Sequence, residues 1–218
     1  MPRPELLPIE ITLPLQYFGS VDYYARLAAC RRVVIDDAAR FDKRLKSAHR
    51  LTVCDTHGII NLTVPVSKPT ERGHNPLRWT DILVSRHGAW WHVIAETLAS
   101  AYGRTPFFEF YIDRLKPFFS ASTPDEFPTV AKLCRAANDA VAAILGLDNA
   151  VVYSSDNITD GISTAKGADA ANPLTIQPVE YYQVRADKFG FQPSMSILDL
   201  IFNMGPESLA VLAAMTGR

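Results

Sequence analysis

The sequence contains none of the short motifs that announce a common cofactor or metal. Neither the GxGxxG nor the GxxxxGK(S/T) pattern occurs, so the phosphate loops of the common nucleotide-binding folds are not expected. The chain has only three cysteines, and no two of them form a CxxC pair. Cysteines this few and this widely spaced argue against a disulfide framework or a zinc knuckle, and they fit a reducing compartment.

The chain also lacks an excess of charge of either sign. Its 22 Lys and Arg residues nearly balance 23 Asp and Glu residues, which leaves a formal net charge of -1. No strong overall field is therefore available to hold nucleic acid or an anionic membrane. We expect no nucleic-acid partner.

Long hydrophobic runs are missing as well. Residues 1–5 have no apolar core of the kind that a signal peptide needs. The longest apolar run, near the C-terminus, is interrupted by Asp199, Gly205, Pro206 and Glu207. We therefore expect no membrane span and a cytoplasmic protein.

The composition is that of an ordinary globular protein. Hydrophobic residues make up 48% and charged residues 21% of the 218 positions, which is enough for one sizeable core and a solvated surface. We predict a single domain over residues 1–218. Its first part, 1–86, is strand-rich, and its second part, 87–218, is mainly helical.

The first part of the chain predicts a βαβ unit. A run rich in β-branched residues and stopped by Pro14 indicates a strand over 9–13. A helix over 21–29 can begin at Ser20, which is a good N-cap, and a second strand follows over 32–35. Because a crossover helix can join parallel strands, we expect a ligand site beyond the strands' carboxyl ends.

After the βαβ unit, the sequence predicts further strands and then mostly helices. A hairpin is predicted from 51–54 and 59–66, and further strands over 79–85 and 151–153. Residues 154–178 hold few large apolar groups and are expected to form a long loop. Helices are predicted over 38–47, 89–102, 106–119, 124–145, 194–203 and 207–215. The fold class is therefore α/β, with an N-terminal mixed sheet that begins with a βαβ unit and a helical C-terminal half.

Two adjacent carboxylates, Asp36 and Asp37, come directly after the second predicted strand. Carboxylates at such a strand end can hold Mg²⁺, or one of them can act as a base. Alternatively, Asp37 caps the helix predicted over 38–47 and Asp36 is solvated. Mg²⁺ is a possible cofactor, and no other cofactor is indicated.

Basic residues follow the acidic pair. Arg40, Lys43 and Arg44 recur at spacings that would place them on one face of a helix, and Arg50 lies further along. Such a face could bind phosphate or carboxylate. The alternative is a basic face that is simply solvated.

Gln16 and Tyr17 follow the first predicted strand, at the same expected edge of the sheet. Tyr17 could donate a hydrogen bond to a ligand, and Gln16 could recognise an amide or a hydroxyl. The alternative is that Tyr17 packs in the core, as large aromatic side chains often do.

Four apolar residues cluster on a helix predicted near the C-terminus: Ile197, Leu200, Ile201 and Phe202. They belong either to the core or to a surface for a partner or a second copy of the chain.

Several segments carry a resemblance to a known family. They are residues 14–18, 62–66 and 105–109, and the most specific one is 196–205, which reads SILDLIFNMG. On these segments the chain resembles the bacterial WbqC-like family, over about residues 11–119 and 181–209.

Members of that family occur in gene clusters for bacterial surface polysaccharide (O-antigen). The resemblance implies a transferase acting on a sugar or nucleotide-sugar intermediate, and the transferred group could be glycine or another amino-acyl group. The catalytic candidates are then Asp36, Asp37 and Tyr17. The candidates for binding a small anionic or sugar-linked substrate are Gln16, Arg40, Lys43 and Arg50.

A second hypothesis is a non-catalytic binding or scaffold protein, acting as a homodimer or with a biosynthetic enzyme. The lack of an obvious nucleophile, metal cluster or phosphate loop in the sequence favours it.

Overall fold

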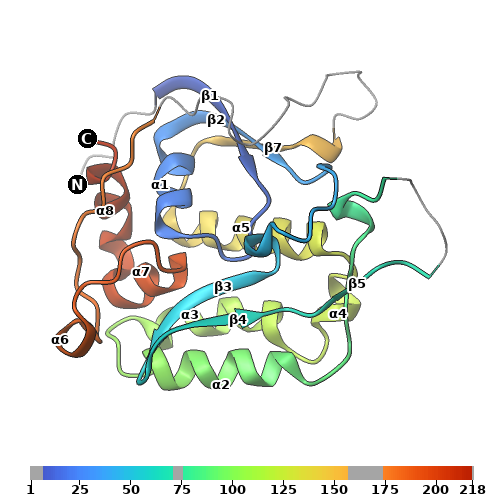
Figure 1. Cartoon of the computed structure of the whole chain (residues 1–218). Helices are drawn as coiled ribbons and strands as arrows, with labels where there is room; N and C mark the ends of the chain where they lie inside the picture. Colours follow the sequence, from blue (N-terminus) through green and yellow to red (C-terminus); the bar gives the residue numbers. More distant parts are fainter. Residues whose placement is uncertain (1–6, 71–75, 157–173, 218) are drawn as a thin grey trace.

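The computed structural model describes residues 7–70, 76–156 and 174–217. It contains a parallel sheet in which β2 (Cys30–Asp36) lies between β1 (Leu7–Pro14) and β7 (Ala150–Tyr153). Helix α1 (Val21–Ala29) connects β1 to β2 (Figure 1). The predicted βαβ unit and the α/β fold class are therefore confirmed.

Helix α1 has the bounds that its sequence predicts, because Ser20 caps it. The Ser20 hydroxyl accepts a hydrogen bond from the backbone N–H of Tyr23 at 3.2 Å. Apolar residues such as Leu27 and the large ring of Tyr24 are fully buried. The helix thus lies with one face in the core beside the sheet.

The sheet alternates between buried and polar positions, as strands with a period of two residues do. On one face the apolar side chains are buried: Ile11, Leu13, Val33 and Ile35. Helices α1 and α5 (Val130–Leu145) lie on this side of the sheet in Figure 1. On the other face Glu10 and Arg32, which are register partners, form an ion pair at 2.9 Å.

The predicted hairpin is formed by β3 (Arg50–Asp55) and β4 (Gly58–Thr63). Asp55 pairs with Gly58, so that only two residues form the turn. Gly58 has a φ of 119°, a backbone conformation that residues with a Cβ rarely adopt. The strand predicted over 59–66 ends earlier than expected, and its last residue starts β5 (Val66–Ser67).

The strand predicted over 79–85 is correct only at its end. β6 (Leu83–Val84) pairs with β5, whereas Trp79–Asp81 form the 3₁₀ turn η2. The Asp81 carboxylate accepts the N–H of Arg78 at 2.9 Å. A short polar side chain that bonds its own backbone in this way competes with strand pairing.

The helix predicted over 38–47 does not form, so this prediction is wrong. The segment makes turns, and only Lys46–Ala48 adopt a 3₁₀ conformation, η1. The N–H of Phe41 donates to the carbonyl of Leu77 at 2.8 Å, and the Phe41 ring packs edge-on against Trp79 at 4.9 Å. These tertiary contacts outweigh the local helical spacing.

Helices dominate from residue 90 onward. α2 spans Trp90–Tyr102, and α3 (Phe108–Leu115) continues as the 3₁₀ turn η3 (Lys116–Phe119). The helix predicted over 106–119 begins late, because the N–H of Phe107 donates to the carbonyl of Phe202 at 3.1 Å.

The helix predicted over 124–145 is divided into α4 (Thr123–Glu126) and α5. Pro128 lies between them, and its carbonyl accepts the N–H of Val84 at 3.0 Å, so the connection runs alongside β6. Thr129 then caps α5, and Gly146 ends it in the left-handed conformation.

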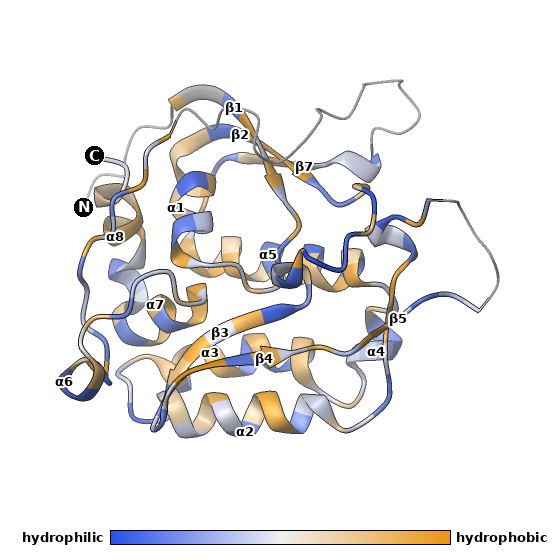
Figure 2. Cartoon of the chain, in the orientation of Figure 1, coloured by the Kyte–Doolittle hydropathy of each residue, from blue (hydrophilic) through white to orange (hydrophobic). Residues whose placement is uncertain are grey.

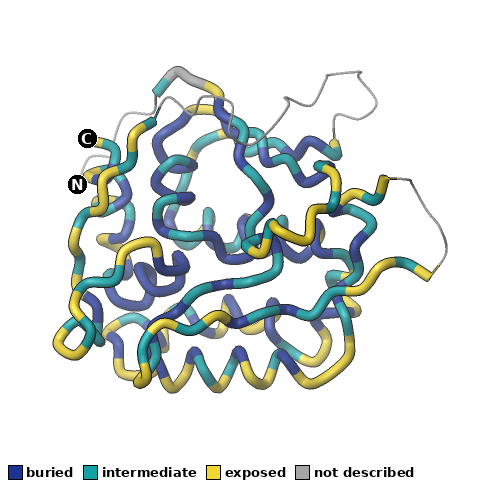
Figure 3. The backbone as a smooth tube through the Cα atoms, in the orientation of Figure 1, coloured by how far each residue is buried: buried dark blue, intermediate teal, exposed yellow. Residues whose placement is uncertain are grey.

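Three helices complete the chain: α6 (Ala186–Phe189), α7 (Ile197–Met204) and α8 (Ser208–Ala214), with the 3₁₀ turn η5 (Gly205–Glu207) between the last two. The four apolar residues of α7 singled out in the sequence are 0% exposed: Ile197, Leu200, Ile201 and Phe202. They belong to the core, and α7 is drawn in the dark blue of buried residues in Figure 3.

One stretch, Ile197–Ala214, is long and apolar enough to cross a membrane by length and composition alone. It is 61% buried inside the protein. It also bends at Gly205, where φ is 52° and where a Cβ would lie 2.5 Å from the Phe107 ring. These features are those of a core segment.

The long loop predicted over 154–178 lies mostly outside the described residues, which omit 157–173. Residues 174–178 have no regular structure. They are held against the C-terminal helix, since the N–H of Gln177 donates to the carbonyl of Met215 at 3.0 Å.

The buried carboxylate of Asp199, on α7, anchors the segment that precedes α6. It accepts hydrogen bonds from the Tyr181 hydroxyl at 2.6 Å and from the Gln183 amide at 2.8 Å. The Tyr102 hydroxyl at the end of α2 also bonds to it. Since three donors converge on one carboxylate, this residue connects three parts of the chain.

Asp199 should make the stability of the protein depend on pH. Burial raises the pKa of its carboxyl in the folded state, and the three hydrogen bonds only partly offset this effect. The folded pKa therefore lies above the unfolded value of about 3.9. The associated stabilisation is complete below about pH 4 and is lost as the pH rises through the folded pKa.

We therefore expect the free energy of unfolding of the wild type, relative to that of Asp199→Asn, to fall as the pH rises from about 4 to about 7. Urea denaturation at several pH values measures this difference. Asp187→Asn removes an exposed carboxylate and serves as the control. Identical pH profiles for the wild type and Asp199→Asn would contradict the prediction.

Candidate functional site

The carboxyl ends of the three parallel strands meet at one edge of the sheet. Pro14 at the end of β1 pairs with Asp36 at the end of β2, and Ile35 pairs with Tyr153 at the end of β7. The residues that follow each strand therefore come together at this edge. In an open α/β sheet this is the place where ligands bind.

Asp37 is buried at this edge, and both of its carboxylate oxygens accept hydrogen bonds. It is 2% exposed, and one of its oxygens accepts the N–H of Ser155 at 2.8 Å. The other oxygen accepts the Ser155 hydroxyl at 2.6 Å. No helix follows for it to cap, so Asp37 instead joins the end of β2 to the end of β7.

Asp36 is half-buried, and its side chain has a single partner among the described residues. The Ser154 hydroxyl lies 2.7 Å from one carboxylate oxygen of Asp36. The same hydroxyl oxygen accepts the N–H of Ala38 at 3.1 Å, which orients it. Asp36 is therefore the carboxylate of the pair that a ligand can reach.

Arg135, on α5, places a positive charge at this edge, and no signal in the sequence pointed to it. Its guanidinium lies over the Tyr153 ring, 4.1 Å from the ring centroid. It makes two hydrogen bonds to Asp156, one of them at 2.8 Å. The Asp156 hydrogen bond is the main cause that raises the pKa of Arg135, and the nearby charge of Asp37 adds to it. The same bond lowers the pKa of Asp156.

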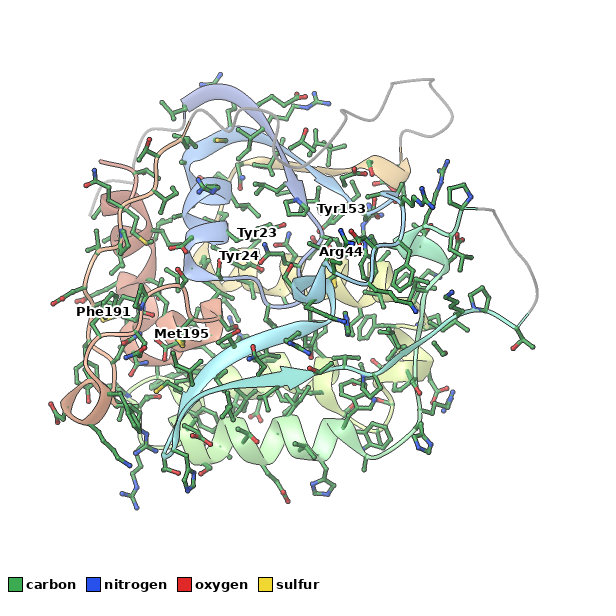
Figure 4. The ribbon with its side chains drawn as sticks, viewed as in Figure 1. Tyr23, Tyr24, Arg44, Tyr153, Phe191 and Met195 are labelled. Atoms are coloured by element: carbon green, nitrogen blue, oxygen red, sulfur yellow. The ribbon has the colours of Figure 1, made fainter. Side chains whose placement is uncertain are left out.

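The Tyr153 ring, on which the Arg135 guanidinium stacks, is itself fixed by hydrogen bonds. The Tyr153 hydroxyl lies 3.0 Å from the Asp139 carboxylate and 3.2 Å from the Asn138 amide nitrogen. Figure 4 labels Tyr153 near the end of β7, with Tyr23 and Tyr24 of α1 on the same side of the sheet. Burial raises the pKa of all three phenols, so they remain neutral.

The predicted basic face is not assembled, because the helix over 38–47 is absent. Arg40, Lys43 and Arg44 are exposed on the turn segment after β2, which is mostly blue in Figure 2. Arg50 lies in β3, and its Nε donates to the Thr63 hydroxyl at 3.0 Å. The structure therefore places Arg50 on the hairpin and the other three residues on the turn segment.

Gln16 and Tyr17 have structural partners. Tyr17 is 0% exposed, and its hydroxyl donates to the carbonyl of Phe118 at 2.9 Å. Burial raises the pKa of this hydroxyl well above its ordinary value. Gln16 accepts the N–H of Ser20 at 3.3 Å through its side chain. The geometry thus favours core packing for Tyr17, the alternative that the sequence left open.

In the part of the chain that the structure describes, no group of three or more His, Cys, Asp or Glu side chains could hold a metal ion. Asp37 uses both of its oxygens in hydrogen bonds to Ser155. Any Mg²⁺ would therefore have Asp36 as its main protein ligand and would need most of its oxygen ligands from substrate or water.

The fold and this edge define an α/β protein with a polar site beyond the ends of a parallel sheet. The chain belongs to the WbqC-like protein family, whose profile matches residues 16–177. This match includes residues 120–177, which carry none of the segments that resemble the family by eye, and it ends before residues 181–209. No curated protein and no solved structure matches the chain.

The interaction between Asp37 and Ser155 should be important for stability. Asp37→Ala leaves the N–H and the hydroxyl of Ser155 without their buried acceptor, which should lower the free energy of unfolding by about 2–3 kcal/mol. Glu180→Ala removes an exposed carboxylate and should change the free energy of unfolding by no more than about 0.5 kcal/mol. Chemical denaturation measures both values. Equal effects of the two substitutions would show that the buried hydrogen bonds are not important.

Proposed function

We propose that the protein is a cytoplasmic transferase that acts on a sugar or nucleotide-sugar intermediate of surface-polysaccharide biosynthesis. Membership of the WbqC-like family supports the biosynthetic context. The observation that carries the proposal is the half-buried carboxylate of Asp36, held at the carboxyl edge of a parallel sheet with Arg135 nearby. The buried thiols of Cys54 and Cys134 fit the reducing cytoplasm.

In this proposal Asp36 acts as the general base. Its carboxylate takes the proton from the acceptor hydroxyl or amine, while the acceptor atom forms a bond to the transferred group and the leaving group departs. An amino-acyl group, such as glycine, is the transferred group that we propose. The Ser154 hydroxyl keeps Asp36 in one orientation.

The remaining candidate residues take different parts. Asp37 positions the site by holding Ser154 and Ser155, and it does not touch the substrate. Arg40 and Lys43 are exposed on the turn segment that leaves the same edge, so they can attract an anionic donor or acceptor. Tyr17 is too deeply buried to orient an acceptor.

Asp36→Asn should reduce the rate of transfer about 10²- to 10⁴-fold, because the amide cannot accept the proton. The fold should survive, since Asn can still accept the Ser154 hydrogen bond. Mass spectrometry of mixtures of the purified protein with nucleotide-sugars and an activated amino-acyl donor, such as a glycyl thioester whose thiol is the leaving group, measures the transfer. Asp42→Asn, on the exposed turn that follows, is the matched control. Unchanged transfer in the Asp36→Asn variant would refute the assigned role.

A scaffold protein is the second candidate. The partner surface considered for it in the sequence is lost, since Ile197, Leu200, Ile201 and Phe202 are buried. Two other apolar side chains, Val93 on α2 and Phe110 on α3, are 58% and 73% exposed. A large exposed ring such as Phe110 is a candidate anchor for a contact with a second copy or with a biosynthetic enzyme.

If this second function is correct, Phe110→Ser should weaken self-association or the capture of a partner at least about tenfold, because an aromatic anchor often dominates an interface. Analytical ultracentrifugation of the protein alone, and co-purification from the native host, measure these two cases. Phe191→Ser, which changes a partly buried ring elsewhere, serves as a comparison. A monomer whose partners do not change in the Phe110→Ser variant would exclude this surface.

A further inference from the structure

The Arg135 guanidinium has the geometry of an oxyanion-binding group. Its Nη1 donates to one oxygen of Asp156 at 2.8 Å, and its Nη2 donates to the other oxygen. Two parallel hydrogen bonds of this kind are the arrangement by which arginine binds carboxylates and phosphates. The partner here is a side chain of the same protein.

The Arg135 guanidinium is already oriented before any ligand binds, because neighbouring side chains hold it. It stacks on the Tyr153 ring at 4.1 Å, and the Tyr153 hydroxyl is fixed by Asn138 and Asp139. An arginine that is already oriented loses little freedom when it binds a ligand. The contact with Tyr153 thus orients Arg135 for a ligand independently of the ion pair with Asp156.

The ion pair between Arg135 and Asp156 is accessible and can open. The two side chains are 38% and 46% exposed, so that solvent reaches both of them. Ion pairs with this exposure are weak, because water competes for both charges. A ligand that reaches the edge can therefore take the place of the Asp156 carboxylate.

A second arginine–aspartate ion pair, elsewhere on the molecule, shows what is particular to the pair of Arg135 and Asp156. Arg86 and Asp125 form an ion pair of the same kind, with side chains 65% and 52% exposed. Arg86 has no aromatic ring beneath it among the described contacts. Arg86 also has no contact with the carboxyl edge of the parallel sheet among the described residues, whereas Arg135 stacks on Tyr153 at that edge.

We propose that Arg135 is the oxyanion-binding residue of the site and that Asp156 occupies its place until a ligand displaces it. The bound group carries one negative charge, as a carboxylate or a phosphodiester does, because it replaces one carboxylate. Asp36 and Asp37 end the neighbouring strand at the same edge, and their carboxylates disfavour a group of higher charge. This inference rests on the function proposed above and assigns the anionic part of the substrate to Arg135.

The test is a binding measurement that requires no turnover. Dimethyl phosphate, acetate and inorganic pyrophosphate are each titrated into the ¹⁵N-labelled protein, and the guanidinium signal of Arg135 is followed by NMR. Dimethyl phosphate and acetate represent the two kinds of single charge. Pyrophosphate tests whether a higher charge is rejected.

We expect dimethyl phosphate or acetate to bind to the wild type, and Arg135→Gln to abolish the binding. Asp156→Asn should strengthen the binding about fivefold, because the internal competitor is removed. Arg86→Gln and Asp125→Asn are the matched controls and should leave the affinity unchanged. The melting temperature of each variant shows whether it is folded, and Arg135→Lys provides a second, milder change at the same position.

Several results would overturn the inference: no binding of any probe, binding that survives in both Arg135 variants, or an Asp156→Asn variant with unchanged affinity. Tighter binding of pyrophosphate than of the other two probes would refute the single charge. None of these results depends on Asp36. A failed transfer assay with intact oxyanion binding would therefore count against the proposed reaction and leave this site standing.

Discussion

The pairing of β2 with β1 on one side and with β7 on the other is the constraint on which the rest of the structure depends. Parallel strands cannot be joined by a tight turn, so each pairing needs a long connection. The second connection is very long, and it brings Ser154 into contact with Asp36 across 118 positions of the chain. Because all three strands end at one edge, residues that are remote in sequence share one small volume there.

The two neighbouring aspartates at this edge have different environments for a simple geometric reason. Successive side chains at the end of a strand point in opposite directions. Asp37 turns inward, where Ser155 satisfies its oxygens, and Asp36 remains half-buried beside Ser154. One carboxylate thus holds the site together, and the other is free to meet a ligand.

The parts of the fold that depend on local sequence could be predicted. Ser20 starts a helix by capping it, Gly146 ends one, and Gly58 permits a tight hairpin turn. For the same reason Asp36 and Asp37 could be placed at a strand end. These signals lie within a few residues of the elements that they determine.

The other half of the site could not be predicted, because it depends on contacts that the sequence does not display. Nothing near Arg135 indicates that α5 passes beside the end of β7, and nothing near Ser155 indicates its bond to Asp37. The turn segment over 38–47 shows an error of the opposite kind, because there the sequence predicts a helix that does not form. Its helical spacing is real, but Phe41 gains more by packing on Trp79 than by continuing a helix.

The deep burial of α7 has a consequence for the boundaries of this protein. The family match ends at residue 177, yet the core that contains Ile11 also contains Ile197, Phe202 and Leu212. A fragment cut at the limits of the match would lose all of β1, together with α7 and α8, and would leave a large apolar surface open to water. The unit that folds is therefore longer than the unit that sequence similarity delimits, and a shortened gene designed from the match alone would yield an aggregating polypeptide.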